Sequence, residues 1–308
     1  LVCLVLMLSL GLSVGAFAAY PEKPIRMIMP WAAGGDSDVL MRIVAQHIEE
    51  HLGQPMVVVN ITGASGAIGA REVLNAAPDG YTILAGNDSI GMGYASGVAD
   101  FHYFDFEPIA LMTSTPMVVA THADNPWQDF KEALEAARQN PNSIRFGVTL
   151  GSTTQLLPLA AAARADAPFR IVGYDGTAPR MTALLGKHID LGETSVPAGI
   201  DYVRSGELRL LAITSGTRHS SLPDLPTLKE QGLDFEFAAN RGFFAPKGTP
   251  REIIITLQEA LRKVAQDPVF IQRIEELGTD VRFLDAQEYS EYLKGVLQEY
   301  DELLSVLL

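Results

Sequence analysis

The sequence of 308 residues contains one cysteine, Cys3, which precedes an uncharged apolar segment at residues 4–19. This segment contains Ala16-Phe17-Ala18, the small-x-small pattern of a signal peptidase site, so we expect residues 1–19 to be a cleaved signal peptide. The run is too short for a membrane anchor, which needs about 20 apolar residues. A lipid-modified cysteine would follow the run, not precede it. The mature chain then lacks cysteine, which excludes thiol catalysis and thiolate metal sites.

Basic side chains are also scarce. The chain has 23 Lys and Arg against 37 Asp and Glu, a formal net charge of -14 that argues against nucleic acid as a partner. A content of 47% hydrophobic and 19% charged residues excludes the disordered and low-complexity classes. The length favours two domains of about 100 to 150 residues each.

Short apolar runs alternate with helical patterns along the mature chain, which predicts a parallel α/β architecture. We expect strands at residues 25–29, 56–59, 81–84, 117–120, 144–147, 171–172, 189–191 and 208–214. No repeat or linker separates two halves. The second domain is therefore expected to be inserted in the first, with residues 20–121 and 241–308 forming one domain and residues 122–240 the other.

Helix starts and stops are readable at several positions. A helix is expected from Asp38 to Leu52, with its stop at Gly53. The segment 249–252 has the pattern of a capping box with proline at the first helical position. Asp267-Pro268 begins the next helix, and Asp285 with Glu288 begins the last. That last helix is expected to bury Tyr289, Leu293, Val296, Tyr300 and Leu304.

The first strand leads into a loop that is suited to an anion. Its residues are Trp31, Ala32, Ala33, Gly34, Gly35, Asp36, Ser37 and Asp38. Converging backbone amides and the positive end of the helix dipole favour a carboxylate or phosphate here. Asp36, Ser37 or Asp38 is expected to be the N-cap. A capped strand-to-helix turn without a ligand is the alternative interpretation.

A second loop of this kind, at residues 147–154, also lies between a strand and a helix. Ligands in open α/β sheets bind beyond the carboxyl ends of the strands. Two such loops that face each other across a cleft would therefore enclose a small anion. Further loops that follow strands lie at residues 60–69, 86–89 and 174–179.

The segment 62–69 resembles the glycine-rich turn that holds a dinucleotide in short-chain dehydrogenases. None of the nine tyrosines is followed by lysine at the fourth position, and a complete strand-helix unit precedes the turn. A dinucleotide-dependent oxidoreductase is therefore only the alternative function. His47 and His51 have the i, i+4 spacing of a metal pair, but Glu49 and Glu50 indicate a solvated helix surface. We predict no metal site, no cofactor and no catalytic residue.

Several motifs, each weak alone, occur together in a fixed order. They lie at residues 24–25, 30–35 with Asp38, 52–55, 78–82, 174–176, 211–215 with Arg218, 222–227 and 245–250. In this order the chain resembles the substrate-binding proteins of tripartite tricarboxylate transporters, also called the Bug family. The resemblance covers essentially the whole mature chain.

The resemblance implies a periplasmic receptor with a two-domain, periplasmic-binding-protein-like fold, a type II flytrap with the ligand cleft between the domains. Such a receptor is not an enzyme. It would bind a small organic carboxylate, such as a di- or tricarboxylate, an aromatic acid or an amino acid. Its partners would be the membrane subunits of the transporter. We expect a monomer.

The residues that we expect to bind the ligand fall in both domains. The first domain is expected to use the loop of residues 31–38 together with Gly63, Ala64 and Ser65. The second domain is expected to contribute Thr149, Gly151, Ser152, Thr153 and Tyr174. Asn87, Ser89 and Thr194 are secondary candidates. Arg241 would either clamp a distal carboxylate or pair with an aspartate, and Glu193 would repel an anion unless a donor intervenes.

Overall fold

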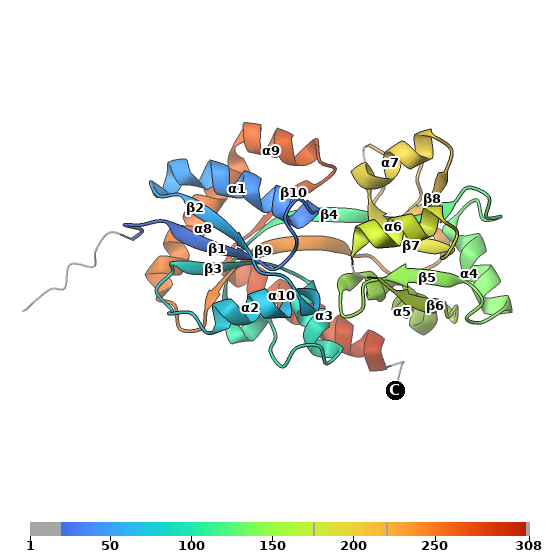
Figure 1. The fold of residues 1–308 in the computed structure, drawn as a ribbon, viewed down its shortest axis with the longest axis horizontal. Helices are drawn as coiled ribbons and strands as arrows, with labels where there is room; N and C mark the ends of the chain where they lie inside the picture. The colour runs from blue at the N-terminus through green and yellow to red at the C-terminus, as the bar shows by residue number, and fades with distance from the viewer. Residues whose placement is uncertain (1–19, 175, 220, 306–308) are drawn as a thin grey trace, which may run out of the picture.

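The computed structural model describes residues 20–174, 176–219 and 221–305. The predicted signal peptide at residues 1–19 lies outside them. Within these ranges, no helix combines the length and apolar character needed to span a bilayer. Figure 1 shows two lobes side by side, with strand β4 running across the middle of the molecule between them.

The first lobe is built on a mixed sheet. Its strands are β2 (Met56–Asn60), β1 (Ile25–Met29), β3 (Thr82–Asn87), β9 (Ala238–Pro246), β4 (Phe106–His122) and β10 (Asp280–Leu284). Strand β1 is parallel to β2 and β3, whereas β9 is antiparallel to β3 and β4. The carboxyl ends of the three parallel strands therefore meet at one edge of the sheet, which is where open α/β sheets bind ligands.

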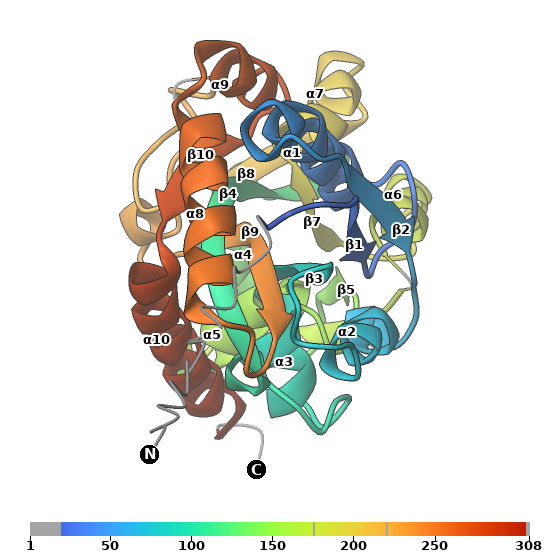
Figure 2. The same cartoon turned by 90° about the vertical axis from the view of Figure 1, so that its left-hand side faces the viewer.

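Helices cover both faces of this sheet. One face carries α1 (Asp36–Leu52), α8 (Arg251–Gln266) and α9 (Pro268–Glu275), and the other carries α2 (Ala67–Leu74), α3 (Ser89–Ala95) and α10 (Ala286–Ser305). Figure 2 shows α1 on one side of strands β1 and β3, with α2 and α3 on the other. The side chains of β9 alternate between these faces: Phe243 packs on the α1 and α8 side, and Phe244 packs against Tyr289 of α10.

The second lobe has a smaller sheet. Its strands are β6 (Arg170–Gly173), β5 (Arg145–Val148), β7 (Leu191–Ser195), the carboxyl half of β4 and β8 (Leu208–Ile213). Its helices are α4 (Phe130–Gln139), α5 (Leu156–Ala165), α6 (Thr177–Leu185) and α7 (Val196–Arg204). Short 3-10 turns occur at η1 (Ala64–Gly66), η2 (Tyr103–Asp105), η3 (Thr153–Gln155) and η4 (Lys229–Gln231).

Strand β4 belongs to both lobes. Up to Pro116 it pairs with β9, and from Met117 onward it pairs with β7. The chain returns to the first sheet at Ala238, where β9 begins. The buried core is also shared, because side chains of α10 and α5 join one hydrophobic cluster that spans the two lobes. The division at residues 121/122 and 240/241 stays a prediction.

Several predicted element boundaries are confirmed and others are wrong. The strand at residues 25–29 and the caps of the last two helices are correct: Asp267 accepts from the Val269 N–H, and Asp285 and Glu288 cap each other reciprocally. The prediction of a capping box at 249–252 is wrong, because the N-cap is Pro250 and the Thr249 hydroxyl donates to the Pro246 carbonyl. Helix α10 buries Leu303, whereas the predicted Leu304 is only partly buried.

Candidate ligand-binding site

The loop between β1 and α1 presents an uncapped helix end. The N-cap is Gly35, and no side chain of the described residues caps it, so the prediction that Asp36, Ser37 or Asp38 is the N-cap is wrong. The first N–H groups of a helix lack partners within the helix, and they carry the positive end of its dipole. The loop Ala32 to Gly35 and Asp36 are exposed and Ser37 is half-buried. This end of α1 is therefore available to an anion.

Asp38 fixes the shape of this loop. Its carboxylate is 2% exposed and accepts hydrogen bonds from the Gly34 N–H at 2.9 Å, Arg42 Nε at 2.8 Å and Asn60 Nδ2 at 2.8 Å. Burial acts to raise the pKa of Asp38, but the bonds from Arg42, Asn60 and Gly34 outweigh it and hold the pKa below its ordinary value. Asn60 also donates to the Trp31 carbonyl at 2.9 Å. The carboxylate of Asp38 thus holds the loop rather than facing outward.

Arg241, on β9, contacts the N-terminal end of α1 at Ser37. It is 5% exposed, and its Nε donates to Ser37 Oγ at 2.8 Å, while Nη1 donates to Thr115 Oγ1 at 2.6 Å and to the Ala239 carbonyl at 2.9 Å. No carboxylate of the residues that the structure describes lies within 4.0 Å of it. Burial lowers the pKa of Arg241 to about 10, so it is still a cation at neutral pH. The alternative of a direct ion pair with an aspartate is therefore not found in the described chain.

The segment 62–69 connects the two lobes. Ser65 Oγ donates to the Leu150 carbonyl of the second lobe at 2.9 Å, and Ala64 and Ser65 have positive φ angles of 45° and 50°. The glycines do not leave a cradle for a dinucleotide. A Cβ on Gly63 would meet the Ile68 side chain at 2.6 Å, and one on Gly66 would meet the Trp31 ring at 3.3 Å.

The loop of the second lobe is held by its own hydroxyls. Thr154 Oγ1 accepts from the Thr149 N–H at 2.8 Å, and Ser152 Oγ donates to the Thr149 carbonyl at 2.8 Å. Ser152 is also the N-cap of η3. Thr153 is half-buried, and Gly151 has a φ of 73° and packs against Val98 and Ser65 of the first lobe. Loops 63–66 and 149–152 therefore face each other.

Arg180 and its neighbours form a part of the site that the sequence did not reveal. Arg180 Nη1 donates to Thr149 Oγ1 at 3.2 Å, and Nη2 donates to the Glu193 carbonyl at 3.0 Å. The Glu193 carboxyl is fully buried without a hydrogen-bond partner in the described chain, and this burial raises its pKa to about 8. The only sequence signal is an arginine on the inner face of α6, one residue before buried Met181.

The remaining predicted residues lie around the same interface. Asn87 Oδ1 accepts from the Ser89 N–H at 2.9 Å, and Asn87 is the cross-strand neighbour of Arg241. The Tyr174 N–H donates to the Val148 carbonyl at 2.8 Å. The Thr194 hydroxyl is buried and forms no hydrogen bond with any described residue. His47 Nδ1 lies 2.8 Å from Asp267, and the described chain contains no metal-holding cluster of three His, Cys, Asp or Glu residues.

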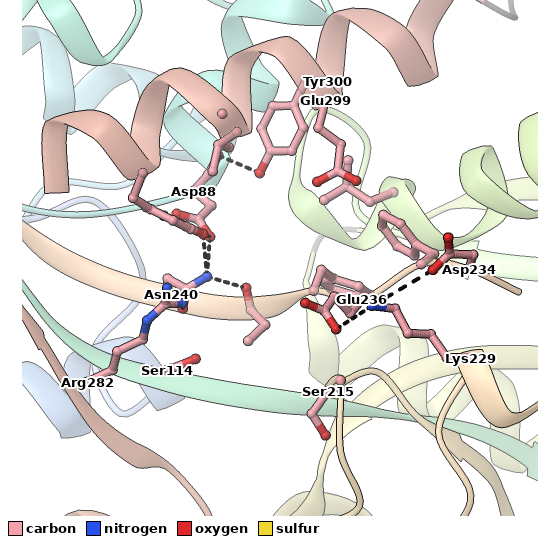
Figure 3. A pocket seen from close by; sticks show the side chains of 18 of the residues that line it. Asp88, Ser114, Ser215, Lys229, Asp234, Glu236, Asn240, Arg282, Glu299 and Tyr300 are labelled. Carbon is pink, nitrogen blue, oxygen red and sulfur yellow. Dashed lines mark hydrogen bonds and ion pairs between the residues drawn. The ribbon is translucent and has the colours of Figure 1, made fainter. Parts of the chain in front are cut away.

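A cavity of about 670 Å³ lies between the lobes, on the face of β9 opposite to Arg241 (Figure 3). None of the predicted ligand residues lines it. Asn240 points into this side and donates to Asp88 Oδ2 at 2.7 Å, which also accepts from the Tyr292 hydroxyl at 3.0 Å. Burial raises the pKa of Asp88 to about 6. Arg241 and Asn240 are adjacent in sequence, so β9 contributes side chains to both of its faces.

The chain matches the model of the tripartite tricarboxylate transporter family receptor over residues 40–306. It belongs to this receptor family. An Agrobacterium vitis protein encoded in the ttuE-ttuC' intergenic region is 34% identical, with 85% of this chain and 77% of that protein covered. Protein BugT of Bordetella pertussis is 32% identical, with 84% and 81% covered. The predicted family is confirmed.

Solved structures resemble the receptor over most of its length. The periplasmic binding protein BugD superposes with a TM-score of 0.80 at 32% identity, covering 93% of this chain and 98% of that one. An R. palustris protein with adipate gives 0.81 at 26% identity (93% and 98% covered), and MatC from Rhodopseudomonas palustris with bound malate gives 0.80 at 25% identity (92% and 100% covered). These likenesses confirm the predicted α/β, two-domain periplasmic-binding-protein-like fold. They give no support to the oxidoreductase alternative.

Proposed function

We propose that this receptor binds a small organic carboxylate between its lobes in the periplasm, delivers it as a monomer to the membrane subunits of a tripartite transporter and catalyses no reaction. The observation that carries the proposal is the positive charge at the end of α1. There an uncapped helix N-terminus lies beside Arg241, which has no acidic partner within 4.0 Å in the described chain. The bound adipate and malate of two neighbours are ligands of this chemistry.

In this proposal the ligand residues are those of the loop before α1 in the first lobe and of the loop after β5 in the second lobe. One carboxylate binds the α1 end through backbone N–H groups and the Ser37 hydroxyl. The loop of Thr149 to Thr153, with Tyr174 and Thr194 nearby, contacts the ligand from the second lobe. Closure follows because only the closed form makes both sets of contacts at once, so the ligand shifts an open-closed equilibrium. Residues 20–121 and 241–308 move against residues 122–240, with β4 and β9 as the hinge.

The acidic surface does not prevent anion binding. The net charge of -14 repels anions at a distance, but screening limits this repulsion to about 8 Å at physiological salt. At the helix end itself, the Asp38 carboxylate is occupied by three donors, and the exposed Asp36 carboxylate acts on Arg241. The receptor therefore captures its ligand by local contacts rather than by long-range attraction.

The test is a thermal-shift screen of the mature protein against malate, adipate, citrate, aromatic acids, amino acids and NADH. Ligand at about 1,000 times its dissociation constant should add about 4 kcal/mol to the free energy of unfolding. Ser37→Ala should weaken binding of the active acid about tenfold, because one hydroxyl donor to a charged acceptor is lost. Stabilisation by NADH and by none of the acids would refute the proposal. Unchanged affinity in Ser37→Ala would place the site elsewhere.

A further inference from the structure

Arg180 is a buried cation in the second lobe, and one of its hydrogen bonds ends on Thr149, in the loop that faces the first lobe. It is 1% exposed and lies in space left by two glycines: a Cβ on Gly147 would lie 3.0 Å from its Cγ, and one on Gly192 3.7 Å from its Cδ. Besides the Glu193 carbonyl, its guanidinium donates to Thr149 Oγ1 at 3.2 Å and to Thr177 Oγ1 at 3.3 Å. Both threonines belong to loop ends that follow strands.

The Thr149 hydroxyl is fully used as an acceptor. It accepts from Arg180 Nη1 at 3.2 Å and from the Gly176 N–H at 3.2 Å. A threonine hydroxyl has two acceptor positions and one proton to donate. Both acceptor positions are taken, and no described residue accepts the proton of Thr149, which is half-buried. The hydroxyl is therefore left with a donor role only.

Resting on the proposed function, we propose that Arg180 is a positioning residue that makes the Thr149 hydroxyl a dedicated donor to the bound carboxylate. Arg180 does not touch the ligand. It occupies one lone pair of the Thr149 oxygen and the Gly176 N–H occupies the other, so Thr149 cannot accept a proton from a neutral or cationic ligand. In the first lobe, Arg241 Nε likewise donates one hydrogen bond to the Ser37 oxygen.

This arrangement discriminates by chemistry and not by shape. Either oxygen of a carboxylate can accept from Thr149, whereas a carboxamide has one acceptor oxygen, and its NH₂ group or an ammonium would place a proton against a proton. A site that presents only donors leaves the wrong partner unsatisfied, and an unsatisfied buried polar group is strongly disfavoured. Arg180 should therefore affect the preference for an acid over its amide more than it affects binding in general.

The experiment is a double-mutant cycle of Arg180→Gln and Thr149→Val, with calorimetric titration of adipate, malate and adipamide. Each single variant should reduce the preference for adipate over adipamide about tenfold, and the double variant should reduce it no further. Thr177→Val is the matched control, since it loses one bond from the same guanidinium and should keep the preference. Thr149→Ser, which retains a hydroxyl, should also keep it. A purely structural role predicts equal losses for acid and amide.

A second measurement covers the case in which Arg180→Gln does not fold. Arg180→Lys retains the charge and should fold, with a preference between those of the parent and Thr149→Val. If the parent binds an acid but the effects of Arg180→Gln and Thr149→Val on the preference for acid over amide are additive, the role of Arg180 is overturned. The proposed function is then left intact. A parent that binds neither adipate nor malate nor any acid of the screen would overturn both.

Discussion

The strand-to-helix loops of the two lobes, one before α1 and one after β5, are stabilised by different chemistry. In the first lobe, the loop before α1 is held by a charged network around the Asp38 carboxylate. In the second lobe, the loop after β5 is held by the neutral hydroxyls of Ser152 and Thr154. Each loop also has a buried arginine behind it. We therefore expect the first loop to be the more rigid of the two, and the second, held by weaker bonds, to be the one that adjusts in the proposed closure.

Asp38→Ala should give the largest effect, because it removes the acceptor of three hydrogen bonds at once. Buried donors left without an acceptor destabilise by about 1–3 kcal/mol, so we expect a loss of about 3 kcal/mol in the free energy of unfolding. Urea unfolding followed by circular dichroism measures this loss. Thr154→Val, the corresponding change in the second lobe, should lose only about 1 kcal/mol. Equal losses in the two variants would remove the contrast between the loops.

Glu193→Gln should remove a large pH dependence of stability that arises in the second lobe, beside Arg180. The folded-state pKa of Glu193 is about 8, above its ordinary value of 4.5. Between these values the unfolded chain is ionised and the folded chain keeps its proton, so stability falls as pH rises and levels off above about 8. The parent should lose up to about 1.4 kcal/mol more than Glu193→Gln between pH 6 and pH 7.

The comparison of the parent with Glu193→Gln, each measured from pH 5 to 9, separates this group from others. Asp88, with a pKa of about 6, contributes a loss of the same sign below that pH in both proteins. Arg180 is the charged group that acts on Glu193, and its attraction opposes the effect of burial on the pKa. Parallel stability curves for the two proteins would mean that the pKa of Glu193 is not raised in the folded state, because another group stabilises its ionised form.

Ser65→Ala should give the smallest effect and tests the contact between loop 63–66 of the first lobe and loop 149–152 of the second. The hydroxyl bond to the Leu150 carbonyl is exposed, so its loss should weaken ligand binding about two- to fivefold by destabilising the closed form. Isothermal titration calorimetry with the acid found in the screen measures the change. Ser143→Ala, which removes an exposed bond within one turn of the second lobe, is the control and should bind like the parent. An unaltered affinity in Ser65→Ala would mean that this hydrogen bond does not stabilise the closed form.

The sequence predicts those parts of the receptor that depend on local patterns. Short apolar runs locate β1 and β2, the stop at Gly53 locates the end of α1, and the loop proposed to bind an anion is recognised by its place between a strand and a helix. The long strands between the lobes are harder: β4 was expected only at residues 117–120, and β9 and β10 were not predicted. Their length depends on pairing with strands far away in the chain.

The two buried arginines show that contacts between distant segments also limit the prediction of single site residues. Arg241 was recognisable as a charge in an apolar segment, although its bond to Ser37 joins residues 204 positions apart. Arg180 was not recognisable, because its pocket is made by Gly147 and Gly192 on two other strands. Such a pocket has no signature near position 180. Buried polar groups of this kind are defined by tertiary packing alone.

The alternation of Asn240 and Arg241 on β9 has a consequence for how the family can change over time. Insertion or deletion of one residue in this strand would exchange the two side chains between the faces, placing the amide behind the anion site and the guanidinium in the cavity beside Asp88. The segment can therefore accept substitutions but not a change of length. Variation in chain length is expected instead in the surface loops that precede it, and new ligand preferences are expected to arise by substitution within a strand of constant register.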